Sequence, residues 1–210
     1  AGGYGTRLGE ETKKKPKPLV KIGGKPIIWH IIKIYSHYGI NEFIICLGYK
    51  GSLLKAELNR LNHNNVWNIK FVNTGLNTMT GGRIKRIKKY LTDNQNFCLS
   101  YGDGLSDVNI KKLIKFHTKN NKMGTLTAVK YKNPKGVLSI NNNLKVKTIK
   151  EKPLEYINGG FFVLSKKIFK YLKNDQTVFE NYPLTKLGKE KKLYAYKHKS
   201  FWYCMDTIRD

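Results

Sequence analysis

Apolar positions along the chain change their spacing in a regular way, and this change predicts the order of helices and strands. Residues 27–38 (IIWHIIKIYSHY) carry an apolar helical face that ends at Gly39, a residue type that often caps helices in the left-handed conformation. Residues 43–47 (FIICL) are wholly apolar, which is typical of a buried strand. A helix over 52–61 and a strand over 67–71, where apolar positions alternate, are expected next.

The same alternation of helix and strand continues through the first part of the chain. The expected elements are a helix over 83–91, a strand over 97–101, a helix over 109–118 and a strand over 125–131. Strands that alternate with helices predict an α/β fold. We therefore expect a Rossmann-like, mostly parallel mixed sheet with helices on both faces.

After residue 133 the predicted strands become shorter and more frequent. They are expected over 136–140, 145–150, 157–164, 193–198 and 201–205, with helices near 166–173 and 178–189. No linker-like composition separates the two parts, so we expect one domain over 1–210 in which the second part extends the same sheet and carries a second substrate. The chain starts inside a glycine-rich turn without the strand that such a turn normally follows, so we expect either that the chain is cut short there or that the first strand comes from elsewhere.

The charge of the chain indicates an anionic partner. Its 40 Lys and Arg residues against 14 Asp and Glu residues give a net charge of +26. Nucleic acid is one candidate, but the lysines are spread over the whole chain and only five arginines are present to contact base edges. We interpret most of the charge as a solvated surface that attracts small polyanions, and we expect no nucleic-acid partner.

Cysteine usage and hydropathy bear on where the protein works. Cys46, Cys98 and Cys204 stand singly, in an odd number and without the spacing of a zinc site. A reducing cytoplasm fits this usage. No stretch approaches the roughly 18 apolar residues of a membrane span, and the start shows no signal pattern. We expect a cytoplasmic protein without a membrane partner.

The opening segment AGGYGTRL is the strongest candidate for a phosphate-binding loop. Gly2, Gly3 and Gly5 allow a tight turn whose successive amides point at one anion. The segment matches neither the dinucleotide fingerprint nor the P-loop, and a glycine cluster alone is equally consistent with a plain turn. Arg7 favours the phosphate site, because a guanidinium beside such amides makes a bidentate phosphate contact.

Lys17 is the second candidate phosphate ligand. It lies between Pro16 and Pro18 in a lysine-rich stretch, which by itself is typical of a solvated, extended segment. The two prolines restrict the backbone on both sides of Lys17. Its ammonium group is therefore expected to be held in one place near the glycine-rich turn.

Two aspartates follow apolar strands and are candidates for a metal site. Asp103 lies between Gly102 and Gly104 directly after the strand over 97–101, and Asp206 ends a late apolar strand. The carboxyl ends of strands are where α/β sheets bind ligands, although an Asp in a tight turn is an equally ordinary reading. Two carboxylates with substrate phosphate oxygens form a typical Mg²⁺ site. We predict that the two aspartates converge on Mg²⁺.

Three further loops have small or charged residues that suit a ligand. Glu151, Lys152 and Pro153 follow a predicted strand. The glycine pair in 158–161 is either a bulge in the next strand or a place where a sugar approaches the backbone closely. Residues 79–83 form a loop that enters a helix, and their small side chains leave room for a flat base against the backbone. The histidines show no metal spacing, and no nucleophile-elbow pattern is present. A covalent intermediate is not expected.

Taken together, these motifs resemble a known enzyme family. GGYGTRL, then Thr12, then PKP, is similar to the signature of the sugar-1-phosphate nucleotidylyltransferases. YGDG at 101–104, EKP at 151–153, NGGFF at 158–162 and MDT at 205–207 occur in that family's order. The longer segments KPIIWHIIKIYSHYGINEFIICLGYKG, TMTGGRIKR and INGGFFVL resemble its cytidylyltransferase members that act on glucose 1-phosphate.

The resemblance implies an activity and a set of site residues. The implied reaction joins CTP and glucose 1-phosphate into CDP-glucose and pyrophosphate with Mg²⁺, in a homo-oligomer. Residues 1–132 would be the nucleotide-binding half and 133–210 the sugar-phosphate-binding half, cut short at both ends. The implied catalytic residues are Arg7, Lys17 and Asp103, and the implied metal ligands are Asp103 and Asp206. The implied nucleotide-binding residues are Gly2, Gly3, Tyr4, Gly5, Thr6, Arg7, Thr78, Gly81, Arg83 and Asp103. The implied sugar-phosphate-binding residues are Gly136, Glu151, Lys152 and Asn158.

Two other functions stay open from the sequence. The first keeps the chemistry and replaces CTP by dTTP or UTP. The second is a non-catalytic fragment that binds anions or nucleic acid through its net charge of +26.

Overall fold

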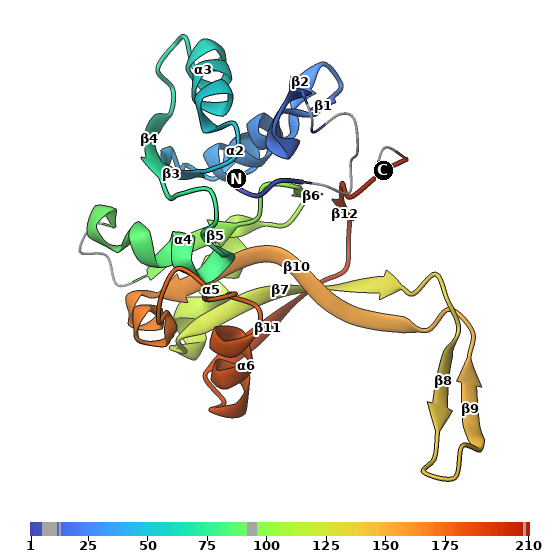
Figure 1. Ribbon diagram of the computed structural model, residues 1–210. Helices are drawn as coiled ribbons and strands as arrows, with labels where there is room; N and C mark the ends of the chain where they lie inside the picture. The colour runs from blue at the N-terminus through green and yellow to red at the C-terminus, as the bar shows by residue number, and fades with distance from the viewer. Residues whose placement is uncertain (6–11, 13, 92–95, 208) are drawn as a thin grey trace.

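The structure is a computed structural model that describes residues 1–5, 12, 14–91, 96–207 and 209–210, and a four-stranded sheet forms its centre (Figure 1). The strand order of this sheet is β11-β7-β10-β5. Its strands are β5 (Asn96–Ser100), β7 (Gly124–Lys132), β10 (Leu154–Ser165) and β11 (Leu193–His198). Strands from both parts of the chain therefore share one sheet.

The directions of the strands correct one expectation. β10 lies between β5 and β7 and runs antiparallel to both. Among the described strand pairs, only β7 with β11 and β3 with β4 are parallel. The α/β class is confirmed, but the expectation of a mostly parallel sheet is wrong. β5 and β7 do run in the same direction, as the helix between them, α5 (Ile110–Asn120), predicts, but the later β10 enters between them in the opposite direction.

A second layer comes from the first part of the chain. β3 (Glu42–Leu47) and β4 (Asn68–Asn73) form a parallel pair, covered by α2 (Ile27–His37) and α3 (Gly51–Leu61). The type and order of these four elements agree with the helices and strands that the apolar spacing predicts. α2 ends before Gly39, whose φ of 81° is the left-handed cap that the sequence indicates. The apolar side chains of this layer are buried in one cluster: Leu19, Ile28, Ile32, Ile45, Leu54, Leu58 and Trp67.

The remaining elements are short. They are η2 (Lys17–Leu19), β1 (Lys21–Ile22), β2 (Lys25–Pro26), α4 (Thr80–Arg86), η3 (Lys88–Tyr90), β6 (Gly104–Ser106), η4 (Lys166–Tyr171), α6 (Tyr182–Lys189) and β12 (Trp202–Cys204). The helix expected over 166–173 is a 3₁₀ turn, and the one expected over 178–189 begins only at Tyr182, because Pro183 favours the first turn of a helix. Of the described helices, none combines the length and the apolar character needed to cross a bilayer.

A large cavity separates the two sheets. β3 and β5 are both edge strands, and residues of both line one cavity of about 1310 Å³. Among the described residues, no strand pairs with the edges that face this cavity. The structure therefore has a four-stranded sheet and a separate parallel pair, which corrects the expectation of one continuous sheet.

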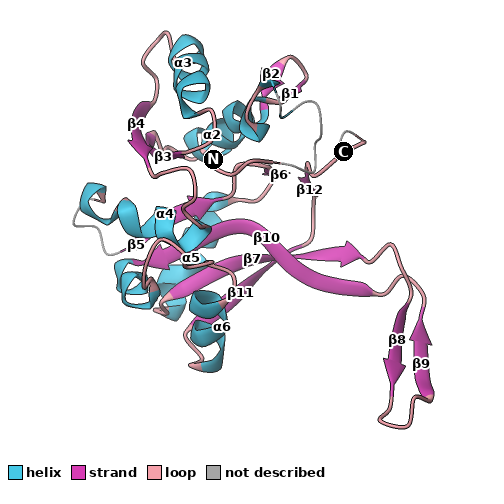
Figure 2. Cartoon of the chain, in the orientation of Figure 1, coloured by secondary structure: helices cyan, strands magenta, loops and turns pink. Residues whose placement is uncertain are grey.

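An antiparallel arm extends away from both layers. It consists of β8 (Val137–Ile140) and β9 (Val146–Lys150), and Figure 2 shows it projecting beyond the body of the protein. Every residue of both strands is exposed. The arm carries exposed apolar side chains, including Leu144 at its tip.

A second apolar cluster, which includes side chains of β10, offers a test of the fold. Leu164 of β10 is fully buried among Phe162, Ile168 and Leu187. We expect Leu164→Ala to lower the free energy of unfolding by about 3 kcal/mol, because the substitution leaves a cavity in a packed core. Urea unfolding measures this change. Leu144→Ala is the matched control: that side chain is 86% exposed, so a change within about 0.5 kcal/mol is expected. Equal effects of the two substitutions would contradict the assigned core.

Candidate functional site

Lys17 joins the two predicted metal ligands. Its ammonium group donates hydrogen bonds to Asp103 Oδ2 and Asp206 Oδ1, both at 2.8 Å. The Lys17 side chain is only 13% exposed, while the two carboxylates are more open at 28% and 38%. Three charged groups that are distant in the sequence therefore meet at one point.

The pairing of β6 with β12 explains why the two aspartates meet. These strands are antiparallel, and Cys204 lies opposite Gly104. The Met205 amide donates to the backbone oxygen of Asp103 at 2.9 Å, which continues the pairing one step further. Asp103 precedes β6 and Asp206 follows β12, so the antiparallel register places both carboxylates at the same end of the ladder.

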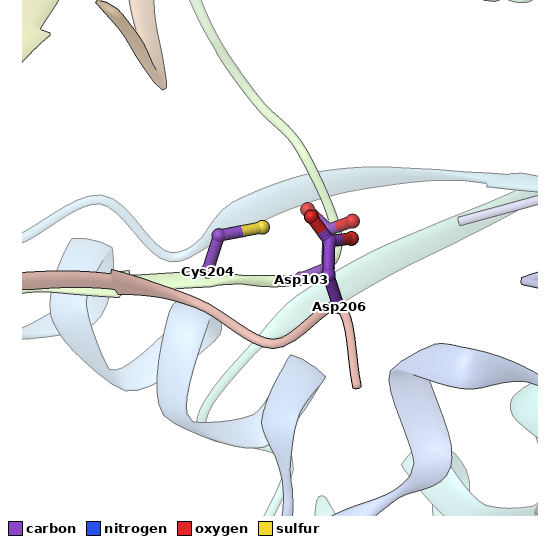
Figure 3. Close-up of side chains that lie close together, drawn as sticks. All are labelled: Asp103, Cys204 and Asp206. Atoms are coloured by element: carbon purple, nitrogen blue, oxygen red, sulfur yellow. The ribbon is translucent and has the colours of Figure 1, made fainter. Parts of the chain in front are cut away.

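Cys204 is a third potential ligand in this cluster. Residues 204 and 206 are two positions apart on an extended segment and so point to the same side. Figure 3 shows the Cys204 thiol directed toward the two carboxylates. One ligand atom from each of Asp103, Cys204 and Asp206 lies within 4.8 Å of the others. The sequence pattern around Cys204 does not indicate this position as a ligand.

The electrostatics of the cluster keep Lys17 charged. Burial by itself would lower the pKa of Lys17, but the hydrogen bonds that its ammonium group donates to Asp103 and Asp206, together with their negative charge, outweigh burial, so the pKa is raised. Burial, followed by the negative charge of Asp103 and Asp206, raises the pKa of Cys204 to about 12. The described cluster is thus a fixed ammonium between two carboxylates, beside a neutral thiol.

The glycine-rich turn packs against this cluster. Gly5 has a φ of 67°, and a Cβ atom there would lie 2.9 Å from Lys17 Cβ, so the position requires glycine. Gly2 has no room for a side chain because the Arg83 guanidinium occupies the space. Gly3 is exposed and open. The backbone therefore passes close to Lys17, where the sequence analysis places the triphosphate.

Arg83 stabilises the turn through the protein backbone. Its buried guanidinium donates to the backbone oxygens of Gly2, Leu47, Gly75 and Leu76 and to the Thr74 hydroxyl, at 2.7 to 3.2 Å. Burial, partly offset by Cys46, lowers the pKa of Arg83. These contacts show a clamp that fixes Gly2 against the β3–β4 layer, whereas direct nucleotide contact by Arg83 stays a prediction.

The clamp can be tested by a conservative substitution. We expect Arg83→Lys to lower the free energy of unfolding by about 2 to 3 kcal/mol, because an ammonium cannot replace the planar fork and leaves buried carbonyl groups unpaired. Arg86→Lys is the control: Arg86 pairs with Asp175 on the surface, with both side chains more than 40% exposed, and a loss below about 1 kcal/mol is expected. Chemical denaturation of both variants gives the comparison, and equal losses would argue against the clamp.

The predicted cytidine-site residues lie at the start of α4. Thr78 is buried just before the helix, and the Gly81 amide donates to the Thr177 backbone oxygen at 2.8 Å. A Cβ at Gly81 would lie 2.7 Å from that oxygen, so α4 can pack this closely against Thr177 only with glycine at position 81.

Tyr4, another predicted nucleotide-binding residue, is 45% exposed, and its hydroxyl donates to Asn77 Oδ1 at 3.1 Å.

Asn158 lies in a hydrogen-bond network at the junction of β5 and β10. Its Nδ2 donates to the Tyr101 hydroxyl at 3.1 Å, and its Oδ1 accepts from the Gly160 amide at 2.9 Å. The Tyr101 hydroxyl in turn donates to Glu180 Oε1 at 2.5 Å. Neither Tyr101 nor Glu180 is among the site residues predicted from the sequence. The YGDG motif contains Tyr101, whereas no pattern around Glu180 marks it.

The other predicted sugar-phosphate residues lie at the base of the arm. Glu151 and Lys152 are exposed just after β9, and a Cβ on Gly136 would lie 3.0 Å from a Glu151 carboxylate oxygen. These residues are close to one another, but they lie outside the lining of the large cavity. The structure does not bring them together with Asn158.

The large cavity gathers most of the remaining predicted residues. Those that line it are Gly2, Gly3, Gly5, Lys17, Arg83, Asp103, Asn158 and Asp206. Tyr4, Thr78 and Gly81 lie outside its lining, and Thr6 and Arg7 lie outside the described residues. A cleft with a glycine-rich turn, a fixed ammonium and two converging carboxylates suits a polyphosphate and a cation.

Comparison with known proteins decides the family. A family model described as nucleotidyl transferase matches residues 1–207. The chain belongs to this family. Over the whole chain it is 45% identical to a protein of Salmonella typhimurium named glucose-1-phosphate cytidylyltransferase, of which it covers 90%.

Solved structures agree with the fold of this nucleotidyl transferase. HddC from Yersinia pseudotuberculosis matches with a TM-score of 0.77 at 28% identity, covering 100% of this chain and 92% of that one. UDP-glucose pyrophosphorylase in complex with UDP-glucose matches with a TM-score of 0.74 at 21% identity, with the same coverage of both chains. The second likeness concerns the fold alone.

Proposed function

We propose that this nucleotidyl transferase transfers a cytidylyl group from CTP to glucose 1-phosphate and releases pyrophosphate. The observation that carries the choice of substrates is the 45% identity, over the whole of this chain, to the Salmonella typhimurium protein named glucose-1-phosphate cytidylyltransferase. The convergence of Lys17, Asp103 and Asp206 in the cavity supports the chemistry, because the site offers groups of both charges to a triphosphate and its counterion.

The proposed reaction is a direct displacement at the α-phosphorus. A phosphate oxygen of glucose 1-phosphate attacks the α-phosphorus of CTP, and the bond from that phosphorus to the pyrophosphate oxygen breaks as the new bond forms. Positioning and charge neutralisation supply most of the rate enhancement in such transfers. Lys17 and Arg7 are proposed to offset the repulsion between the two anionic substrates, and Asn158 to hold the sugar; Glu151 and Lys152 could join them only if the base of the arm moved toward the cavity.

Asp103 and Asp206 are proposed to hold the Mg²⁺ that accompanies the nucleotide. The fit is supported by the position of the Lys17 ammonium, a positive group that already contacts both carboxylates at 2.8 Å. Two carboxylates with phosphate oxygens suit Mg²⁺, which keeps several waters. When bound, the ion neutralises charge on the phosphates.

The choice of nucleotide is tested by initial rates. Pyrophosphate release is measured with glucose 1-phosphate, Mg²⁺ and each of CTP, dTTP and UTP. We expect kcat/KM to be at least about tenfold higher with CTP, a ratio that differences in pocket contacts supply readily. A preference for dTTP or UTP would replace the proposed nucleotide. A salt-dependent oligonucleotide affinity that survives in Asp103→Ala, with no nucleotide turnover by the parent chain, would favour the non-catalytic alternative.

We also propose that the protein acts as a homo-oligomer in the cytoplasm. The projecting arm exposes apolar side chains, such as Leu138, Leu144 and Ile149, which is typical of a contact surface. Cys46, Cys98 and Cys204 are free thiols, which fits a reducing compartment. Light scattering after gel filtration tests the assembly, and a monomeric mass at micromolar concentration would contradict it.

A further inference from the structure

Glu180 links two chain segments that line the large cavity. Its Oε1 accepts a hydrogen bond from the Tyr101 hydroxyl at 2.5 Å, and its Oε2 accepts one from the Thr80 hydroxyl at 2.7 Å. Tyr101 directly follows β5, and Thr80 begins α4. Glu180 is half-buried, and all three residues line the large cavity. One carboxylate thus holds the segment before Asp103 and the helix next to the predicted cytidine site.

The hydrogen-bond directions in this network are determined by chemistry. A carboxylate only accepts, so the Tyr101 hydroxyl must use its single proton on Glu180. The same hydroxyl oxygen then accepts from Asn158 Nδ2 at 3.1 Å. The Gly160 amide donates to Asn158 Oδ1 at 2.9 Å, which agrees with the same orientation of the amide. The second N–H of Nδ2 and a lone pair of Oδ1 remain for a ligand.

Packing and charge hold Tyr101 in this role. Its ring lies edge-to-face against Phe162, with centroids 5.5 Å apart, and a Cβ on Gly160 would meet the ring at 2.8 Å. Burial and then the contact with Glu180 raise the pKa of Tyr101 well above its ordinary value. The hydroxyl therefore remains a donor to Glu180 throughout the pH range of an assay.

We propose that Glu180 and Tyr101 are positioning residues that fix the Asn158 amide so that it presents an N–H donor to a hydroxyl group of the sugar phosphate. This proposal rests on the proposed function, in which Asn158 binds the sugar. The contact with Thr80 extends the role of Glu180 to the nucleotide side, because the same carboxylate anchors the start of α4. The two substrates then depend on one shared acceptor.

Single substitutions separate the two branches of the network. Tyr101→Phe keeps the ring and removes the hydroxyl, so we expect the KM for glucose 1-phosphate to rise about tenfold while the KM for CTP changes less than about twofold. Thr80→Val removes the hydrogen bond from the Thr80 hydroxyl to Glu180. We expect this variant to raise the KM for CTP about tenfold and to change the KM for glucose 1-phosphate less than about twofold. Glu180→Gln is expected to raise both KM values, because its amide offers only one acceptor oxygen.

A second tyrosine–glutamate pair supplies the matched control. The Tyr171 hydroxyl donates to Glu190 Oε2, also at 2.5 Å, but neither residue lines the large cavity. Tyr171→Phe therefore loses the same kind of hydrogen bond and is expected to leave both KM values within about twofold of the parent. The melting temperatures of all variants are measured alongside. Similar KM changes in Tyr101→Phe and Tyr171→Phe, or no change in Tyr101→Phe, would overturn the proposal.

Direct binding distinguishes a failure of this proposal from a failure of the proposed function. Calorimetric titration with glucose 1-phosphate needs no turnover and is performed on the parent, Tyr101→Phe and Tyr171→Phe proteins. A dissociation constant about tenfold weaker in Tyr101→Phe alone supports the positioning role even if CTP is the wrong nucleotide. Equal constants in all three proteins overturn the positioning role and leave the reaction untouched. If the parent binds no glucose 1-phosphate, both proposals fail.

Discussion

Asp103→Asn is expected to lower kcat/KM for CTP and glucose 1-phosphate by two to four orders of magnitude, or about 3 to 5 kcal/mol in barrier. The amide keeps the size of the side chain but removes the charge that faces Asp206 and Lys17. It also weakens the proposed cation site, because a neutral oxygen holds Mg²⁺ less well than a carboxylate. Initial rates of pyrophosphate release at saturating Mg²⁺ measure the loss.

Asp107→Asn is the matched control for this substitution. Asp107 is also an aspartate near the end of β6, but it contacts Ser200 and His198 and does not line the large cavity. We expect its kcat/KM to stay within about threefold of the parent value. Mn²⁺ binding, followed by electron paramagnetic resonance, should weaken in Asp103→Asn and persist in Asp107→Asn. Turnover near the parental level in Asp103→Asn would remove this residue from the mechanism.

Asp103 and Asp206 could be recognised from the sequence as candidate metal ligands, but their meeting could not. Each residue follows an apolar strand, and α/β folds bind their ligands at the carboxyl ends of strands. The sequence also located Lys17, since the flanking prolines mark a restricted backbone. These signals are local and mark each residue separately, whereas the pairing of β6 with β12, about a hundred residues apart, is what brings Asp103 and Asp206 together.

The position of β10 between β5 and β7 could not be predicted from local sequence patterns. Apolar periodicity predicts that β5 and β7 are strands and that α5 connects them in parallel. Which later strand pairs with their edges depends on contacts between residues far apart in the chain. An antiparallel partner buries the same apolar side chains as a parallel one, so the periodicity does not distinguish the two.

Two residues of the site had roles that the sequence could not show. Arg83 belongs to a glycine-containing segment that the sequence indicates as a base contact, but it lies within α4 and its guanidinium donates to five oxygens of the protein itself. Glu180 lies in a segment without a motif, and its role follows only from its contacts with Tyr101 and Thr80. Hydrogen-bond partners are a tertiary property, and a side chain type at one position does not specify them.

Lys17→Met is expected to lower kcat/KM by about 3 to 5 kcal/mol in barrier, comparable to Asp103→Asn. Methionine keeps an unbranched apolar stem of similar length, so the packing against Gly5 is largely preserved. The change removes the positive group that contacts both carboxylates at 2.8 Å. It also removes the cation that is proposed to offset the charge of the triphosphate at the reacting phosphorus.

Two further substitutions separate charge from geometry at this position. Lys17→Arg keeps the positive charge, but the guanidinium is larger and planar and does not fit between the two carboxylates. We therefore expect the kcat/KM of Lys17→Arg to stay below about a tenth of the parental value. Lys21→Met is the control, because Lys21 is exposed in β1 and lies outside the cavity lining. It removes one positive charge from the same segment, and its kcat/KM should stay within about twofold of the parent. If Lys21→Met lost as much activity as Lys17→Met, the general charge of the surface would explain the effect, and the fixed position of the Lys17 ammonium would not.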